Sequence, residues 1–227
     1  MTLDRYGRDT ESIMDDFAQI PLFPLGIVLL PGLPLPLHIF EDRYKDMIRD
    51  CLEHNLEFGV VYYDGNKLRS NGCAARIEKV LKEYEDGRMD VMSVGTRRFR
   101  VSGIDSSLSY LQGNCEFYGD SDGDSAELNS ERERALEALR QFAEFSERSI
   151  DTETLSTLDA TSLSFLIAGT DAFGAAEKQR LLEIDSTRER LQKCIQALER
   201  TLERLRLNEE IKQIIGTNGH IPDAFGT

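Results

Sequence analysis

The three histidines of this 227-residue sequence are its most readily recognised candidates for acid–base chemistry, and they lie far apart at His38, His54 and His220. A catalytic triad can assemble from distant positions, but no GxSxG or HExxH motif accompanies them. His38 lies in an alternating apolar segment and is expected to be packed or capping, and His54 is expected at a helix end. A hydrolase site near His38 and Glu41 remains an open alternative.

Two pairs of neighbouring charged residues could also do chemistry. Glu41 and Asp42 are adjacent, so on a helix they point in different directions and make a poor shared-proton pair. Carboxylates suit the first turn of a helix, where the macrodipole is positive, and that position is expected for both. Arg97 and Arg98 follow Gly95 and could bind an anion, but the pattern favours a solvated turn with one structural ion pair.

Metal and nucleotide chemistry are not indicated. The four cysteines are widely spaced, whereas zinc ligands usually lie two to four residues apart. The sequence contains neither GxxxxGK[ST] nor GxGxxG. We therefore expect no metal site, no cofactor and four reduced, buried thiols. These are Cys51, Cys73, Cys115 and Cys194.

The charge balance limits the classes of partner. The formal net charge is −14, while 40% of the residues are hydrophobic, enough to build a core. Nucleic-acid affinity depends on clustered lysine and arginine, so the balance argues against nucleic acid and against an anionic membrane surface. The polar start lacks the apolar region of a signal peptide, and no apolar run approaches the roughly 18 residues of a membrane span. A cytoplasmic location is expected.

The first half of the sequence predicts strands around one helix. Five of the six prolines fall within residues 21–44, where they would stiffen a strand–loop–strand path and cap sheet edges. Apolar positions after Glu41 recur with helical spacing, and Asp86-Gly87 predicts a hairpin turn. Short strands at this spacing indicate a closed or half-closed antiparallel barrel. The strand segments expected after the helix are 58–63, 74–84, 89–94, 98–104 and 110–117.

The second half predicts helices. Residues 119–129 form a polar, acidic connector, after which Ser130 and Ser186 each precede a glutamate by three residues, which indicates capping boxes. Two shorter helices are expected up to residue 182, broken near glycines. The last helix, from about Thr187, carries a narrow apolar seam. Packing inside its own bundle and dimerisation both remain open. The seam residues are Leu191, Ile195, Leu198, Leu202 and Leu205.

The proline-rich stretch also carries a resemblance. PLFPLGIVLLPGLPLPLHIFEDRY strongly resembles the start of the N-terminal domain of Lon proteases, and GTRRF at 95–99 follows in the right order. The similarity covers residues 19–118 specifically and the helical half more loosely. The matching positions are Pro21, Leu22, Phe23, Pro24, Leu25, Pro31, Gly32, Pro36, Leu37, His38, Phe40, Glu41, Arg43, Tyr44, Gly95, Arg98 and Phe99.

This resemblance implies an α+β fold: an N-terminal PUA-like antiparallel β-barrel with one helix, then a C-terminal α-helical bundle with a long last helix. It implies a non-catalytic domain that recognises substrate polypeptides, because the ATPase and Ser-Lys peptidase domains of Lon have no counterpart in this sequence. The expected divisions are an arm at 1–18, a β domain at 19–118, a connector at 119–129, a bundle at 130–215 and a tail at 216–227.

A binding role agrees with the residues. A rigid apolar strand loses little entropy when a partner docks, and an open sheet edge can accept an extended peptide. The partner would be an unfolded or partly folded polypeptide or a protein such as a protease. The domain would be an adaptor or regulator of proteolysis and a monomer or weak homodimer. RNA binding, known for other PUA-like barrels, is the alternative that the charge disfavours. The expected contact residues are Leu33, Leu35, Leu37, Tyr62 and Tyr63.

Overall fold

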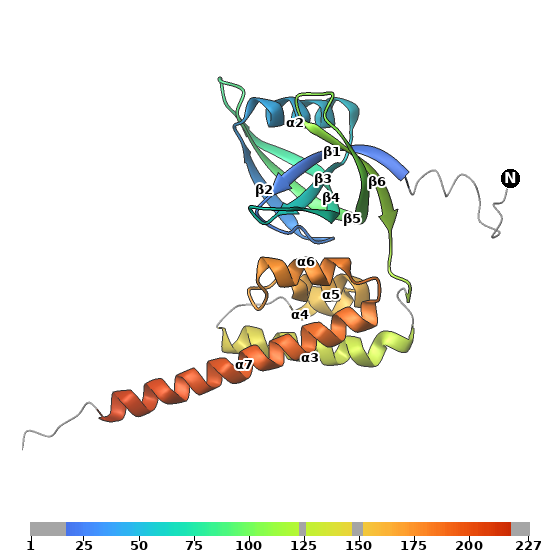
Figure 1. The fold of residues 1–227 in the computed structure, drawn as a ribbon. Helices are drawn as coiled ribbons and strands as arrows, with labels where there is room; N and C mark the ends of the chain where they lie inside the picture. Colours follow the sequence, from blue (N-terminus) through green and yellow to red (C-terminus); the bar gives the residue numbers. More distant parts are fainter. Residues whose placement is uncertain (1–16, 123–125, 147–151, 219–227) are drawn as a thin grey trace, which may run out of the picture.

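The structure is a computed structural model that describes residues 17–122, 126–146 and 152–218. Most of the expected N-terminal arm, His220 and the end of the expected tail lie outside these residues. Six strands and helix α2 come first, and the other helices follow (Figure 1). The strands are β1 (Phe17–Leu25), β2 (Pro34–Ile39), β3 (Phe58–Tyr63), β4 (Leu68–Glu83), β5 (Met89–Asp105) and β6 (Leu111–Tyr118). The helices are α2 (Asp42–His54), η1 (Ala126–Leu128), α3 (Asn129–Phe145), α4 (Thr152–Thr157), α5 (Ala160–Ala168), α6 (Ala175–Glu183) and α7 (Thr187–Asn218).

The strands form one mixed sheet in the order β2-β5-β4-β3-β1-β6, and β6 also pairs with β5. The six-stranded sheet with one helix, followed by helices that end in a long last one, confirms the α+β fold class, but the expectation that all strands pair antiparallel was wrong. β1 and β3 run parallel, with Leu22 opposite Gly59, because the chain crosses through β2 and α2 between them and arrives at β3 in the direction of β1. Of the two expected forms, the half-closed one fits better: β6 returns to pair with β5, whereas β2 pairs only with β5 among the described strands and leaves a free edge.

The proline-rich stretch turns sharply between β1 and β2. Gly32 has φ of 76°, a left-handed conformation that glycine adopts at little cost. Its N–H donates to the Gly95 carbonyl at 2.8 Å, and the Gly95 N–H donates to Leu33 at 2.9 Å. A Cβ at Gly95 would lie 2.3 Å from the Leu30 carbonyl oxygen. The glycines of two family-motif segments therefore fit against each other.

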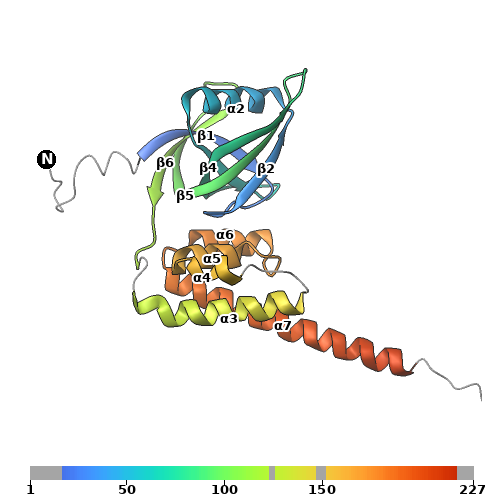
Figure 2. The same cartoon turned by 180° about the vertical axis from the view of Figure 1, so that it is seen from behind.

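Helix α2 packs its apolar face on the sheet as its spacing predicts. Tyr44, Met47 and Ile48 are buried, and the Tyr44 ring lies 4.2 Å from the ring of Phe23 in β1. Leu52, which the spacing places on the same face, is instead exposed. Asn55 ends the helix in a left-handed conformation. Figures 1 and 2 both show α2 at the end of the β half farthest from the helical layer.

In the helical layer, α3 and α5 pack against the first half of α7. The seam residues from Leu191 to Leu202 are buried there, which confirms packing within the bundle for this part. The expected capping box at Ser130 was wrong: α3 begins one residue earlier, and the Ser130 hydroxyl donates to Glu131 at 2.7 Å. Within the part of the chain that the structure describes, no helix is long and apolar enough to cross a membrane.

A buried charge network connects the two halves; we call Arg98, Asp120, Thr187 and Arg190 the joint. Arg98 of β5 and Arg190 of α7 both form ion pairs with Asp120, whose side chain is 3% exposed. Arg98 also donates to the Leu182 carbonyl at 3.0 Å. The Arg190 guanidinium donates to Ser164 at 2.7 Å and lies 3.8 Å above the Phe165 ring centre. The expected ion pair is therefore present at Arg98, but it is buried rather than solvated.

Candidate functional site

The outer face of the β2–β5–β4 region is an apolar strip with a basic margin. Alternation buries Leu35 and Ile39 of β2 and turns the prolines and His38 outward. Residues directly opposite each other on paired strands share a face. Three rows therefore cross this outer face: Pro34, Val94 and Arg76; Pro36, Met92 and Lys79; His38, Asp90 and Lys82.

The edges of this region are poor templates for an added strand. Proline cannot donate to a ladder, so prolines in sheets have their nitrogens on the free side of edge strands. Because β2 pairs with β5 over its whole length, we infer that Pro34 and Pro36 deprive its free edge of two donors. The second half of β4 contains bulges and carries Lys79 and Lys82, which also blunt an edge. A ligand would therefore meet side chains rather than open backbone.

An aromatic group lies at one end of the outer face. The His38 Nδ1 atom lies 2.6 Å from an Asp90 carboxylate oxygen, and the Tyr84 hydroxyl donates to the other oxygen at 2.9 Å. These hydrogen bonds, His38 first and Tyr84 second, hold the pKa of Asp90 below its usual value. The Phe40 ring stacks 6.1 Å from His38 and is 60% exposed. This end therefore presents a fixed aromatic surface.

The structure does not bring together His38 and Glu41, the residues of the alternative hydrolase site. His38 bonds to Asp90, whereas the Glu41 carboxylate pairs with Arg43 at 2.8 Å. No group of three or more histidine, cysteine, aspartate or glutamate side chains among the described residues could hold a metal ion. Burial raises the pKa of the Cys51 and Cys194 thiols to about 12. The buried thiols are therefore protonated and poor nucleophiles.

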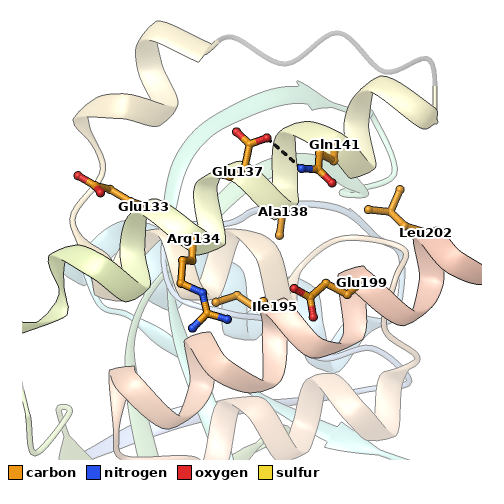
Figure 3. Close-up of a pocket in the computed structure, with 8 residues that line it drawn as sticks. All are labelled: Glu133, Arg134, Glu137, Ala138, Gln141, Ile195, Glu199 and Leu202. Atoms are coloured by element: carbon orange, nitrogen blue, oxygen red, sulfur yellow. Dashed lines mark hydrogen bonds between the residues drawn. The ribbon is translucent and has the colours of Figure 1, made fainter.

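A second surface feature lies between two helices; we call it the α3–α7 groove. It has a volume of about 370 Å³ next to Ile195 and continues along α7 into a second hollow of about 550 Å³. Figure 3 shows Ala138 and Ile195 between the helices, with charged side chains from both helices around them. A hydrogen bond of 2.9 Å from Gln141 to Glu137 lies along α3. Two of its lining residues, Ile195 and Leu202, belong to the apolar seam predicted for the last helix.

Comparison with known proteins decides the family. A family model described as the ATP-dependent protease La (LON) substrate-binding domain matches residues 19–200. The chain belongs to this family. This Lon-type domain is 26% identical to the Lon protease of Flavobacterium johnsoniae over 211 residues, covering 85% of the chain and 25% of that protein. It is 24% identical to the Lon protease of Buchnera aphidicola over 210 residues, covering 87% of the chain and 27% of the relative.

The Lon-type domain thus spans about a quarter of the length of the curated relatives it matches. Two solved structures share its fold. The Lon N-terminal domain protein from Xanthomonas campestris superposes with a TM-score of 0.60 at 27% identity, covering 78% of this chain and 96% of that one. The N-terminal domain of a Mycobacterium avium complex Lon protease gives a TM-score of 0.68 at 18% identity, covering 80% and 98%.

The family motif of this Lon-type domain divides into core and surface positions. Leu22 and Phe99 are buried, and Phe99 limits the space beside Gly59 and Gly72, where an added Cβ would lie within 2.6 Å of its ring. Pro36, His38 and Phe40 face outward. The buried positions of the motif therefore have a packing role, and the outward positions are the ones free to contact a partner.

The five predicted contact residues lie in different environments. Leu35 is 4% exposed, so it lies in the core rather than on the surface. Leu33 and Leu37 are half-buried against the core, and a Cβ on Gly169 would lie 2.3 Å from Leu33. Tyr62 is half-buried opposite Leu25. Tyr63 is 44% exposed, and its hydroxyl donates to the Gly65 carbonyl at 2.9 Å.

Two kinds of residue, one on the outer face and one in the joint, were not identified from the sequence. The outward Met92 and Val94 belong to a predicted strand, and the alternation of that strand could have identified them. Asp120 lies in an acidic segment that reads as a solvated connector, yet it is buried against Arg98 and Arg190. Since Arg190 is 70 positions away, no local pattern indicates this contact.

Proposed function

We propose that this Lon-type domain is a non-catalytic substrate-recognition domain that binds unfolded or partly folded polypeptides, as an adaptor for proteolysis or a regulator of it. Family membership supports a substrate-recognition role. The identity of the site is our own inference: polypeptide contacts the outer face of β2 and its neighbours. The predicted contacts at Leu37, Tyr62 and Tyr63 extend the proposal beyond that face.

The observation that carries the proposal is the exposed apolar surface on a stiffened strand. Pro34, Pro36 and Phe40 are all exposed. Pairing with β5 and the proline rings fix the backbone of Pro34 and Pro36, and Phe40 directly follows the last paired residue of β2. A surface that is already ordered loses little entropy when a partner docks. Unfolded chains expose apolar side chains that folded proteins bury. An apolar surface can therefore bind unfolded chains in preference to folded ones without a catalytic step.

Fluorescence anisotropy tests the proposal directly. The probe is a labelled small disulfide protein that has been reduced and carboxamidomethylated so that it stays unfolded, with its folded parent as control. We expect binding of the unfolded probe alone, with a Kd of about 1 μM, or about −8 kcal/mol. Phe40→Ser should weaken it about tenfold, because burying a phenylalanine contributes about 1.5–3 kcal/mol when complete.

Leu108→Ser is the matched control, because Leu108 is also an exposed apolar residue, at 48%, but lies between β5 and β6. It should leave the Kd unchanged. Tyr63→Ser tests the sequence-predicted contacts separately. Absence of binding up to about 1 mM, about −4 kcal/mol, would contradict general polypeptide capture. Equal weakening by Phe40→Ser and Leu108→Ser would contradict the site.

A further inference from the structure

The α3–α7 groove combines a buried apolar floor with a charged rim. Ala138 of α3 and both Ile195 and Leu202 of α7 are buried and line it. Its two hollows share Gln141, Glu199 and Leu202, so they form one continuous groove. The charged residues that line it are Glu133, Arg134, Glu137, Glu199, Glu203, Arg206 and Glu210.

The groove has the dimensions of a helix-binding site. Its lining on α7 extends from Ile195 to Glu210, which at a rise of 1.5 Å per residue is about 22 Å. Beyond Leu205, every described side chain up to Gln213 is exposed, and α7 projects past the bundle in both views (Figures 1 and 2). Leu207 is 55% exposed on this projecting part. A third helix could lie along α7 and cover it.

The charge of the rim indicates which helix fits. Five carboxylates and two guanidiniums line the groove. Among the described residues, Glu199, Glu203 and Glu210 make no ion pair within 4.0 Å. Complementary potentials favour recognition and a fast encounter. We infer that the α3–α7 groove docks a basic amphipathic helix of a partner protein, with apolar side chains on Ile195, Leu202 and Leu207 and lysine or arginine along the glutamates.

A second copy of this chain fits the groove less well. Each copy has a net charge of −14, and the groove itself is acidic, so association of two copies brings like charges together. The inference is independent of polypeptide capture in the β half, because the groove lies in the helical layer and shares no residue with the outer face.

The test uses the full chain and a labelled 18-residue leucine–lysine peptide with leucines at helical spacing; its glutamate counterpart is the charge control. Anisotropy should show binding of the lysine peptide alone, weaker at higher salt, and circular dichroism should show a gain of helix. Glu199→Gln with Glu203→Gln should weaken binding about threefold to tenfold, since each exposed ion pair contributes only modestly. Leu207→Ser should also weaken it.

Glu83→Gln with Glu85→Gln is the matched control, because it removes the same charge from exposed positions on the β4–β5 hairpin. It should leave binding unchanged. The inference is overturned if both double variants weaken binding equally, if the lysine peptide does not bind, or if it binds without gaining helix. The inference is also overturned if the wild-type chain sediments as a dimer and the Leu207→Ser variant sediments as a monomer. Phe40→Ser should not affect this peptide, which separates the groove from the proposed polypeptide site.

Discussion

Arginine and carboxylate side chains gather in two places in this molecule, the joint and the α3–α7 groove, with opposite consequences. At the joint, Arg98, Asp120 and Arg190 are almost fully buried and paired. At the groove, Glu199, Glu203 and Arg206 are exposed. A charge removed from water must find partners or destabilise the fold, whereas an exposed charge remains solvated. The same residue types therefore hold the two halves together in one place and are available to a partner in the other.

The joint contains two guanidiniums and one carboxylate, so ion pairing with Asp120 alone does not satisfy it. Carbonyl groups provide further acceptors: Arg190 donates to Ile184 at 2.9 Å, and Arg98 donates to the carbonyls of both Leu182 and Ile184. Aromatic rings cover the arginines, with the Arg98 guanidinium 4.5 Å from the Tyr118 ring centre. Arg98 of the β half thus bonds to two carbonyls of the helical half, and Asp120 pairs with arginines from both halves, which fixes how the halves meet.

The largest predicted effect is on the joint. Asp120→Asn keeps the shape but leaves two buried guanidiniums without their carboxylate, and breaking a buried ion pair costs about 3–5 kcal/mol. The free energy of unfolding in urea, extrapolated to water, should fall by that amount. Asp86→Asn is the matched control, because Asp86 pairs with Arg88 at 2.7 Å on the surface; it should cost about 1 kcal/mol or less. Equal losses in the two variants would contradict the distinction.

Acid should weaken the same joint. Burial alone would raise the pKa of Asp120, but hydrogen bonds from Arg190 and Thr187 and the charges of Arg190 and Arg98 lower it below its usual value. Such a carboxyl stabilises the fold above its unfolded pKa, about 3.9, and this stabilisation is lost as the pH falls through the lower folded pKa. The difference in unfolding free energy between the wild type and Asp120→Asn should therefore shrink below about pH 4. A constant difference from pH 7 downward would contradict the prediction.

Local patterns in the sequence predicted the parts of the fold that local forces determine. The strand at 58–63, the hairpin at Asp86-Gly87 and the apolar face from Tyr44 to Cys51 are confirmed. Each depends on alternation, helical spacing or a two-residue turn. The parallel pairing of β1 with β3 was missed, although a helix between two apolar strands is the signal for such a crossover. Alternation predicts that every second side chain of β2 faces outward, but only the structure shows which of the two alternating sets is buried.

Local sequence patterns did not predict the contacts between residues that lie far apart in the chain. The acidic segment after Gly119 resembles a solvated connector, because aspartate, serine and glycine favour turns. Its role depends on Thr187 and Arg190, which lie on α7. The start of α7 shows the same limit. Ser186 does accept the Glu189 N–H at 3.1 Å as the capping box predicts, but Asp122, 65 positions earlier, accepts the Thr187 N–H at 2.7 Å.

The smallest predicted effect concerns this helix start. Asp122 accepts the Thr187 and Arg188 N–H groups at 2.7 and 3.0 Å, the groups that a helix leaves unpaired at its first turn. Asp122→Ala should lower the unfolding free energy by about 1 kcal/mol, as for the loss of a capping side chain. Ser130→Ala is the control. The sequence pattern predicts Ser130 as a helix cap, but its hydroxyl donates to the Glu131 carboxylate instead. This substitution should cost less than about 0.5 kcal/mol. If Ser130→Ala lowers the unfolding free energy as much as Asp122→Ala, the prediction is contradicted. Local sequence spacing, rather than the distant carboxylate, would then determine where capping stabilises these helices.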